Sequence, residues 1–429
     1  MNLKLSLLFL LITANAVLAQ PAEFSPVSRN DMITPAAPNR MKDIFPIGIW
    51  YDGRVEGINC PKPYVDVPFG IENARAYYEK TFKDIKAHNI DIIVIPNTPP
   101  QYRQILFETA DKVGVKIVME LIESADINFG GRLCIRNPDM IQNEQELYKE
   151  LSQIIGPISK HKSLFAYQLI DEPPVEFYHN WYLQSRILGE LDPMHPSFSA
   201  ICYEEDLPRT SSMGTQMLVF DHYPITEKSK PGDYDFNRWI ALMDKLDYYS
   251  KKNNIPYWIV VQAFDKPSVF RHPTEPELRL MTYLSLAHNS KGVFFFLYNS
   301  MTEDELMTGT VDVELNPQPI WQDVSALAGE LQKLSSILPD IKPAQLMAKS
   351  SQHVDVQSFV DSRGKKYLFI SNLDVLNPVT AKVQFEGVSV KHARSLLTKK
   401  TFKINFAEDG SSFISVELSP GYCQLLQLK

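Results

Sequence analysis

The chain has 429 residues, of which 44% are hydrophobic and 22% are charged, as is ordinary for a globular protein. This length predicts two domains. The formal net charge is −8 and the lysines and arginines are scattered along the chain, which excludes the basic surface that nucleic acids require and suits neutral or basic ligands better.

The N-terminus resembles a cleavable secretory signal. An apolar run at 7–12 follows a single charge at Lys4, and Val17 and Ala19 occupy the −3 and −1 positions of a cut before Gln20. A membrane anchor is the weaker interpretation, because the run is much shorter than the roughly 20 residues that a bilayer span needs. We expect residues 1–19 to be a signal peptide and the mature protein to be soluble, without a membrane span, in the periplasm or outside the cell.

Residues 20–44 are rich in proline and poor in large apolar side chains, which is typical of a linker or arm. From residue 45, short β-branched and aromatic runs alternate with longer amphipathic stretches, the pattern of βα units. The predicted strands cover 46–51, 91–96, 115–122, 164–170, 197–203, 216–222, 257–264 and 292–298. The predicted helices cover 71–87, 102–113, 142–161, 177–191, 236–252, 274–288 and 320–338.

Only the link at 204–215 is too short and polar for a full helix. Eight strands with right-handed crossovers close most simply as a (β/α)8 TIM barrel, here over residues 45–342. A doubly wound open sheet is the alternative, but no glycine-rich phosphate loop follows the first strand.

Residues 343–429 show closely spaced strand patterns separated by turn residues. The runs lie at 354–360, 366–371, 380–385, 413–418 and 423–428. They predict a small all-β sandwich domain that packs as an appendage.

Four cysteines, Cys60, Cys134, Cys202 and Cys423, permit three complete pairings in an oxidising compartment. Cys60 and Cys134 follow strands on the same barrel face, so a disulfide between them is possible; buried free thiols are the alternative. The chain has no CxxC, HExxH, GxSxG or phosphate-loop motif. We therefore predict no metal and no cofactor.

In a TIM barrel the reactive groups lie at the C-terminal ends of the strands. Glu172 is the leading candidate, since it continues the alternating set of Ala166, Gln168 and Ile170 that we expect to face the barrel interior. The two prolines that follow it end the strand and display the carboxyl at the mouth. Among aromatic walls its pKa would rise, as a general acid requires. The alternative is that Glu172 caps a loop or pairs with an arginine.

The run at 167–173, Tyr-Gln-Leu-Ile-Asp-Glu-Pro, resembles the Asn-Glu-Pro strand end of the retaining clan of (β/α)8-barrel glycoside hydrolases. Residues 257–264 are similar to the strand that presents the nucleophile in that clan. The resemblance implies that Glu172 is the acid/base. Two positions depart from the clan: Asp171 stands where it has Asn, and Gln262 stands where a nucleophilic Glu is expected.

A second carboxylate must then come from elsewhere, and Asp221 at the end of the sixth strand is the leading substitute. Glu204, Glu205 and Asp265 are further candidates, and a substrate-assisted route, in which a group on the sugar supplies the nucleophile, stays open. Glu120 lies where it would tune the pKa values of neighbouring acids.

Aromatic and polar side chains near the strand ends suit a carbohydrate. The predicted substrate-binding residues are Trp50, Tyr51, Asn97, Asp171, Tyr203, Glu205, Tyr223, Gln262 and Tyr298. We predict an exported glycosidase acting on an oligo- or polysaccharide, with no obligate protein partner evident. The alternative is a non-catalytic carbohydrate-binding barrel in which Gln262 has replaced the nucleophilic Glu.

Overall fold

The structure is a computed structural model. It describes residues 43–51, 71–95, 98, 100–121, 144–173, 175, 178–300, 306–344, 348–350, 353–385, 390–406 and 411–429. The predicted signal peptide, most of the arm, Asn97, Cys60 and Cys134 lie outside these ranges. In the described part, no helix is both long and apolar enough to cross a membrane.

Eight parallel strands form a closed barrel in chain order, with β8 pairing to β1. This confirms the predicted (β/α)8 fold. The strands are β1 (Ile47–Trp50), β2 (Ile92–Ile95), β3 (Lys116–Glu120), β4 (Leu164–Asp171), β5 (Ser197–Ile201), β6 (Leu218–His222), β7 (Tyr257–Gln262) and β8 (Val293–Phe296).

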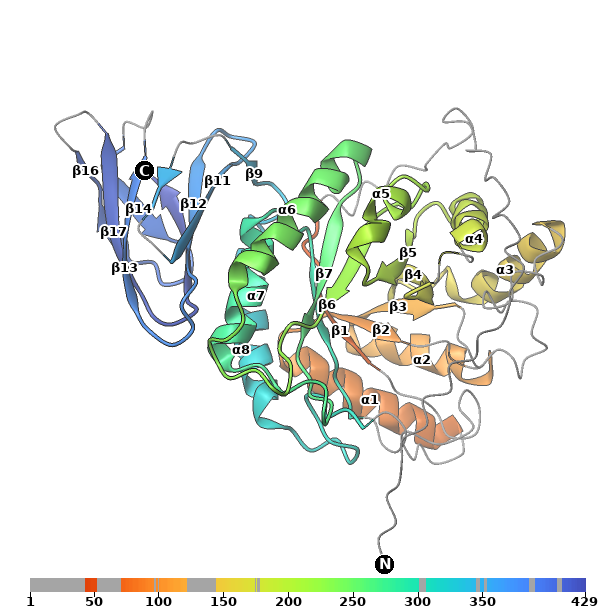
Figure 1. Cartoon of the computed structure of the whole chain (residues 1–429). Coiled ribbons are helices and arrows are strands. Elements are labelled where there is room, and N and C mark those ends of the chain that lie inside the picture. The colour runs from red at the N-terminus through yellow and green to blue at the C-terminus, as the bar shows by residue number, and fades with distance from the viewer. Residues whose placement is uncertain are drawn as a thin grey trace, which may run out of the picture. The chain divides into compact units, whose positions relative to one another are not determined.

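Helices surround the ring of strands (Figure 1). They are α1 (Ile71–Ala87), α2 (Pro100–Val113), α3 (Glu144–Ile158), α4 (Tyr178–Leu191), α5 (Leu207–Thr210), α6 (Phe236–Asn253), α7 (Glu275–Ala287) and α8 (Pro319–Leu334). The short polar link after β5 forms only a 3-10 turn, η5 (Glu204–Asp206), and the single turn of α5, as its composition predicted.

Two apolar layers hold the barrel together. Outward-facing strand residues such as Ile49, Ile93 and Phe220 belong to the large core beneath the helices. The interior has a separate core, in which the Trp258 ring of β7 lies 6.1 Å from the Phe165 ring of β4, three strands away around the barrel. Because bulky rings fill the interior, it is a packed core, and a substrate can enter only at the strand ends.

Strand β4 departs from the regular alternation predicted for it. Its register shifts against β3 near its start and against β5 between Gln168 and Asp171. As a result Phe165 packs in the barrel interior beside Ala166, and Ile170, which we expected to face the interior, packs under the helices. An extra residue in a strand changes the face to which the following side chains point. The inward direction of Ala166 therefore does not predict the direction of Glu172 by simple alternation.

Gly48 on β1 allows the interior to close, since an added Cβ there would run into the Phe294 ring. That ring cannot move aside, because Trp258 lies 5.1 Å and Trp50 5.9 Å from it. We predict that Gly48→Ala lowers the free energy of unfolding by about 1–3 kcal/mol, as overpacking does.

Denaturant unfolding followed by circular dichroism measures this effect. The matched control is Gly329→Ala on α8, whose nearest neighbour is the side-chain amide of Asn89. That amide can shift, and alanine favours a helix over glycine by about 0.5–1 kcal/mol, so we expect the control to be neutral or stabilising. Equal effects at the two glycines would contradict the packing explanation.

The C-terminal residues form two antiparallel sheets, which confirms the predicted β-sandwich. One sheet contains β10 (Ala348–Lys349), β13 (Val379–Phe385), β17 (Ser412–Leu418) and β16 (Asn405–Phe406). The other contains β15 (Thr401–Lys403), β14 (His392–Ser395), β18 (Cys423–Leu428), β12 (Lys366–Asn372), β11 (Val354–Val360) and β9 (Lys342–Pro343).

Buried residues such as Ile370, Val383 and Ile414 form the sandwich core. His288, which follows α7, links this domain to the barrel: its Nδ1 lies 2.6 Å from Asp244 and its Nε2 3.4 Å from Asp355 of β11. Although burial opposes the charged imidazolium, these two carboxylates raise the pKa of His288 to about 9.

Candidate active site

Glu172 lies at the mouth of the barrel, immediately after β4. Its backbone N–H donates to Ala200 O of β5 at 3.0 Å, which ties it to the neighbouring strand. Its φ of 44° falls in the left-handed region that side chains rarely adopt. Such backbone strain is common at functional sites, where it fixes the direction of a side chain. The side chain is exposed to solvent.

Asp221 lies at the end of β6 with only 5% of its surface exposed. Val219 packs in the interior and Phe220 under the helices, so alternation along β6 turns the Asp221 carboxyl inward. One of its oxygens, Oδ1, has no hydrogen-bond partner. The carboxyl hydrogen-bonds with Glu172.

Burial is the main reason that the pKa of Asp221 stands well above its usual range. The charges of Glu172 and Asp171 raise this pKa further, as does the hydrogen bond to Glu172. The raised pKa favours the protonated form of the Asp221 carboxyl, and in that form it donates a hydrogen bond to Glu172. We call Glu172 and Asp221 the acid pair.

Asp171 is the second exposed acid at this end of β4. Its Oδ1 accepts a hydrogen bond from Gln168 Nε2 at 3.1 Å. Gln168 is fully buried and pairs across the ladder with Glu120 at the end of β3. The Asp171 carboxylate is thus held close enough to act electrostatically on Asp221.

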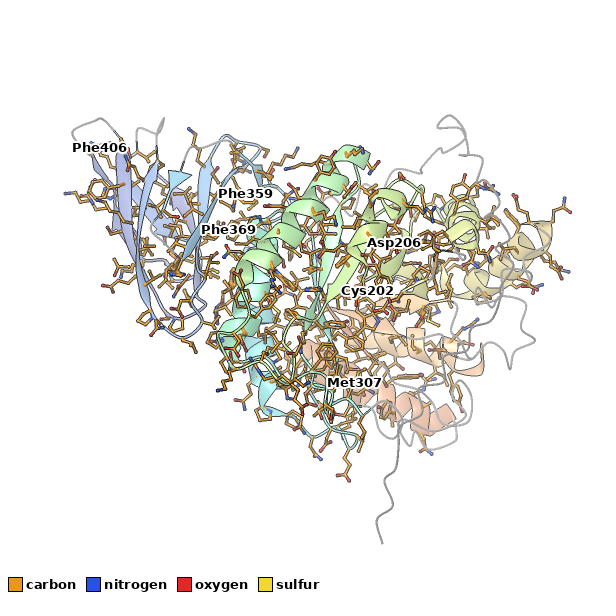
Figure 2. All side chains as sticks on the ribbon, viewed as in Figure 1. Cys202, Asp206, Met307, Phe359, Phe369 and Phe406 are labelled. Carbon is orange, nitrogen blue, oxygen red and sulfur yellow. The ribbon has the colours of Figure 1, made fainter. Side chains whose placement is uncertain are left out.

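Cys202 directly follows β5 (Figure 2), and Glu172 and Asp221 lie close enough to act on its thiol. It is a free thiol, as is Cys423 in the sandwich. Its S–H donates to Glu172, and its sulfur accepts from the Tyr203 hydroxyl. Burial, followed by the charges of Glu172 and Asp221, raises the pKa of this thiol, so it stays protonated as a donor.

Two predicted binding residues, Tyr203 and Tyr223, are brought to the acids. Tyr203 is 55% exposed, and its interactions with Cys202 and Glu172 raise its pKa. Tyr223 is partly buried; burial and the charge of Asp221 raise its pKa well above the usual range. Both phenols therefore remain hydrogen-bond donors at neutral pH.

Three other predicted binding residues lie away from the acids. Trp50 packs in the barrel interior against Phe294. Tyr51 and Tyr298 are almost fully buried between strands and helices, where their rings lie 6.1 Å apart and the Tyr298 hydroxyl donates to Asp84 of α1. Side chains alternate between the two faces of a strand, and at these strand ends Tyr51 and Tyr298 fall on the face that points toward the helices.

Gln262 ends β7 and is fully buried. Its Oε1 accepts from Ile225 N–H, and its Nε2 donates to Ile225 O and to Arg271 O, each at 3.0 Å. Of the alternative acids, Glu204 pairs with Lys245 at 3.3 Å, and Asp265 lies 3.3 Å from His272.

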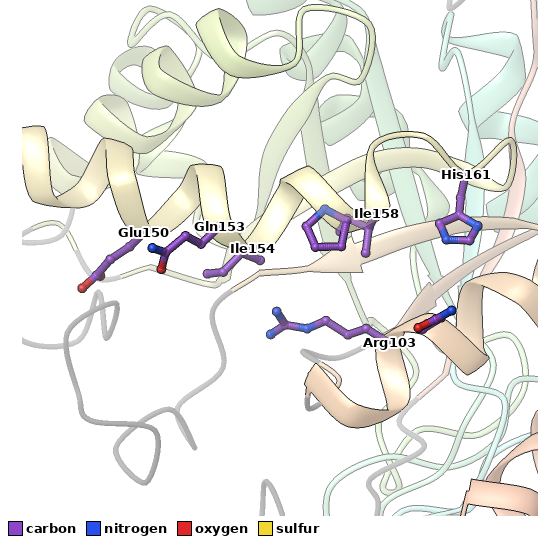
Figure 3. A pocket seen from close by; sticks show the side chains of 8 residues that line it. Arg103, Glu150, Gln153, Ile154, Ile158 and His161 are labelled. Carbon is purple, nitrogen blue, oxygen red and sulfur yellow. The ribbon is translucent and has the colours of Figure 1, made fainter.

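A separate cavity of about 620 Å³ lies between α2 and α3 (Figure 3). Arg103, Glu150 and His161 are among its lining residues, and none of the predicted site residues lines it. His161 already pairs with Asp111 at 2.8 Å and stacks on Phe107. We therefore place the candidate site at the barrel mouth. Within the described ranges, no cluster of three His, Cys, Asp or Glu side chains has the arrangement to hold a metal.

Sequence reasoning did not single out Cys202 as a neighbour of the acids, and it missed Phe270 and Phe296. These two rings lie 6.1 Å and 5.6 Å from Tyr223. Cys202 directly follows the end of a predicted strand, so the sequence alone could have placed it at the barrel mouth. Phe270 lies in the middle of a loop, where no periodic pattern places a side chain.

The closed barrel followed by a β-sandwich has a fold similar to that of several glycoside hydrolases of known structure. A β-galactosidase from Bacillus circulans sp. alkalophilus matches with a TM-score of 0.65 at 8% identity, over 90% of this chain and 99% of that one. A catalytic mutant of a GH42 β-galactosidase from G. stearothermophilus matches with a TM-score of 0.62 at 8% identity, covering 90% and 98% of the two chains.

A glycoside hydrolase family 5 protein from Bacteroides vulgatus ATCC 8482 matches with a TM-score of 0.54 at 10% identity, over 90% of this chain and 88% of that one. No protein-family model matches the chain, and no curated protein matches it in sequence. At such low identities the likeness establishes the shared fold, which confirms the structural side of the predicted resemblance.

Proposed function

We propose that this protein is an exported glycoside hydrolase acting on an oligo- or polysaccharide. The observation that carries the proposal is the Glu172–Asp221 pair, which holds a proton at the mouth of a barrel whose structural neighbours are glycoside hydrolases. The likeness to two β-galactosidases makes β-galactosides the first substrates to test.

In the proposed reaction Glu172 is the general acid and Asp221 replenishes its proton. Protonated Glu172 donates to the glycosidic oxygen as the bond from that oxygen to the anomeric carbon breaks. Water then adds to the anomeric carbon, and its proton returns to the pair. We assign the binding of the sugar hydroxyls to Tyr203, Tyr223, Asp171 and Glu205.

The two carboxyls are too close to stand on opposite sides of a glycosidic bond. They are in hydrogen-bond contact, whereas retaining and inverting enzymes hold their carboxyls roughly 5–5.5 Å and 6.5–9.5 Å apart. Asp221 therefore acts on Glu172 rather than on the anomeric carbon. The attacking group is either water or a group of the substrate itself.

A panel of 4-nitrophenyl glycosides and plant and microbial oligosaccharides tests the proposal. We expect the purified protein to release product from at least one member, with 4-nitrophenyl β-D-galactopyranoside assayed first. Binding on a glycan array without turnover of any member would favour the non-catalytic carbohydrate-binding barrel. Neither binding nor turnover would reject both functions.

A further inference from the structure

Gln262 stands where the related clan places a catalytic carboxylate, yet all of its polar groups are occupied. An amide has one carbonyl acceptor and two N–H donors. Here the carbonyl accepts one bond from Ile225 and Nε2 donates two, to Ile225 O and Arg271 O. All three partners belong to the backbone. Gln262 therefore joins two loops rather than facing a ligand.

The two loops are residues 223–235, after β6, and residues 263–274, after β7. Besides Gln262, the Glu227 N–H donates to Val269 O at 3.0 Å, and Arg271 Nε donates to Ser229 O at 2.7 Å. Arg271 is fixed in turn by a two-pronged pair with the buried Glu277, at 2.8 Å and 2.7 Å. Gln262 lies at the base of this set of links.

The joined loops contribute three rings, and β8 a fourth, to an aromatic cluster beside the acids. We call it the aromatic wall, and it consists of Tyr223, Phe264, Phe270 and Phe296. The Tyr223 ring lies 5.0 Å from Phe264 and 5.6 Å from Phe296. Phe270 comes from the second loop, 5.5 Å from Phe264. Tyr223 is two residues from Asp221, so the wall borders the proton-bearing pair.

We propose that Gln262 is a positioning residue, which sets the aromatic wall against the acid pair and so forms a subsite for the apolar face of a sugar ring. The subsite rests on the proposed function, whereas the link between the loops does not. Flat aromatic rings bind the C–H faces of pyranoses, and their orientation decides the contact. A carboxylate at residue 262 would be no better placed than the amide, because it would face two carbonyl oxygens without a proton to donate.

Hydrogen exchange measured by mass spectrometry tests the link without any substrate. In Gln262→Leu and Gln262→Glu we expect the amides of 223–231 and 264–273 to exchange at least about tenfold faster than in the wild type. The matched control is Gln424→Leu, which removes a buried glutamine that accepts from Ser395 in the sandwich. It is expected to leave both segments unchanged. Unchanged exchange in the two Gln262 variants would overturn the proposal.

Kinetics on whichever aryl glycoside the wild type hydrolyses tests the subsite. We expect Gln262→Glu, and Phe270→Ala as the variant less prone to misfolding, to raise KM at least about fivefold while kcat changes less than threefold. A merely structural effect would lower the amount of active enzyme, and with it kcat, without moving KM. A fall in kcat alone, or a gain of turnover in Gln262→Glu, would overturn the positioning role. If the wild type hydrolyses nothing, the function and the subsite fail, while faster exchange still establishes the link.

Discussion

Glu172→Gln is expected to lower kcat/KM by about 10³-fold, because an amide cannot donate a proton to the glycosidic oxygen. Glu172 is solvent-exposed, and glutamine has nearly the same shape, so the melting temperature is expected to stay within about 1 °C of the wild type. Steady-state kinetics with a leaving group of high pKa gives the clearest result, since such a substrate depends most on acid assistance.

The control is Glu190→Gln on α4, an exposed glutamate that pairs with Arg186. It makes the same chemical change far from the mouth, and we expect it to retain wild-type kinetics. If Glu172→Gln kept more than about a tenth of wild-type kcat/KM, Glu172 would not be the general acid, since that role contributes about 10²-fold or more.

The fold was largely predictable because its signals are local. Each of the eight strands is a short apolar run, and α1 was predicted with the bounds that the structure has. The short sandwich strands β9, β10, β14, β15 and β16 were not predicted. Each spans only two to four residues and is held by its partner strand, so its own sequence carries too little periodicity to identify it.

The site was predictable only in part. Glu172 and Asp221 could be found because each ends a predicted strand, and strand ends meet at the barrel mouth. The direction of Tyr51 and Tyr298 could not be found in the same way, since a shift of one residue turns a strand-end side chain from the mouth to the helix layer. The register shifts in β4 likewise arise from pairing with β3 and β5, which no single strand sequence reveals.

Asp221→Asn is expected to stabilise the protein while it lowers activity. In the unfolded chain an aspartate ionises near pH 3.9, but in the folded protein burial holds the Asp221 carboxyl protonated to much higher pH. Folding must then take up a proton, and the free energy of unfolding falls as pH rises from about 4 toward the raised pKa. Asparagine mimics the protonated carboxyl without this dependence.

We therefore expect Asp221→Asn to gain about 1–3 kcal/mol at pH 7, the scale of an unsatisfied buried polar group. The gain is expected to shrink as the pH is lowered toward 4. Differential scanning calorimetry from pH 4 to pH 8 measures this gain. Asp235→Asn is the control, and its free energy of unfolding is expected to change in the opposite direction. The backbone N–H of Asn237 lowers the pKa of Asp235, so its contribution is present above pH 4 and the control variant is expected to lose stability there.

In the same variant kcat/KM is expected to fall by about 10²-fold, because asparagine cannot return a proton to Glu172. The two results together distinguish the proposed role from simple damage, since a damaged fold would lose activity and stability at once. An Asp221→Asn protein that is less stable than the wild type at every pH would show that the carboxyl is ionised in the folded state. Glu172 and Asp221 would then form no proton-sharing pair, and the mechanism proposed for the mouth would fall with it.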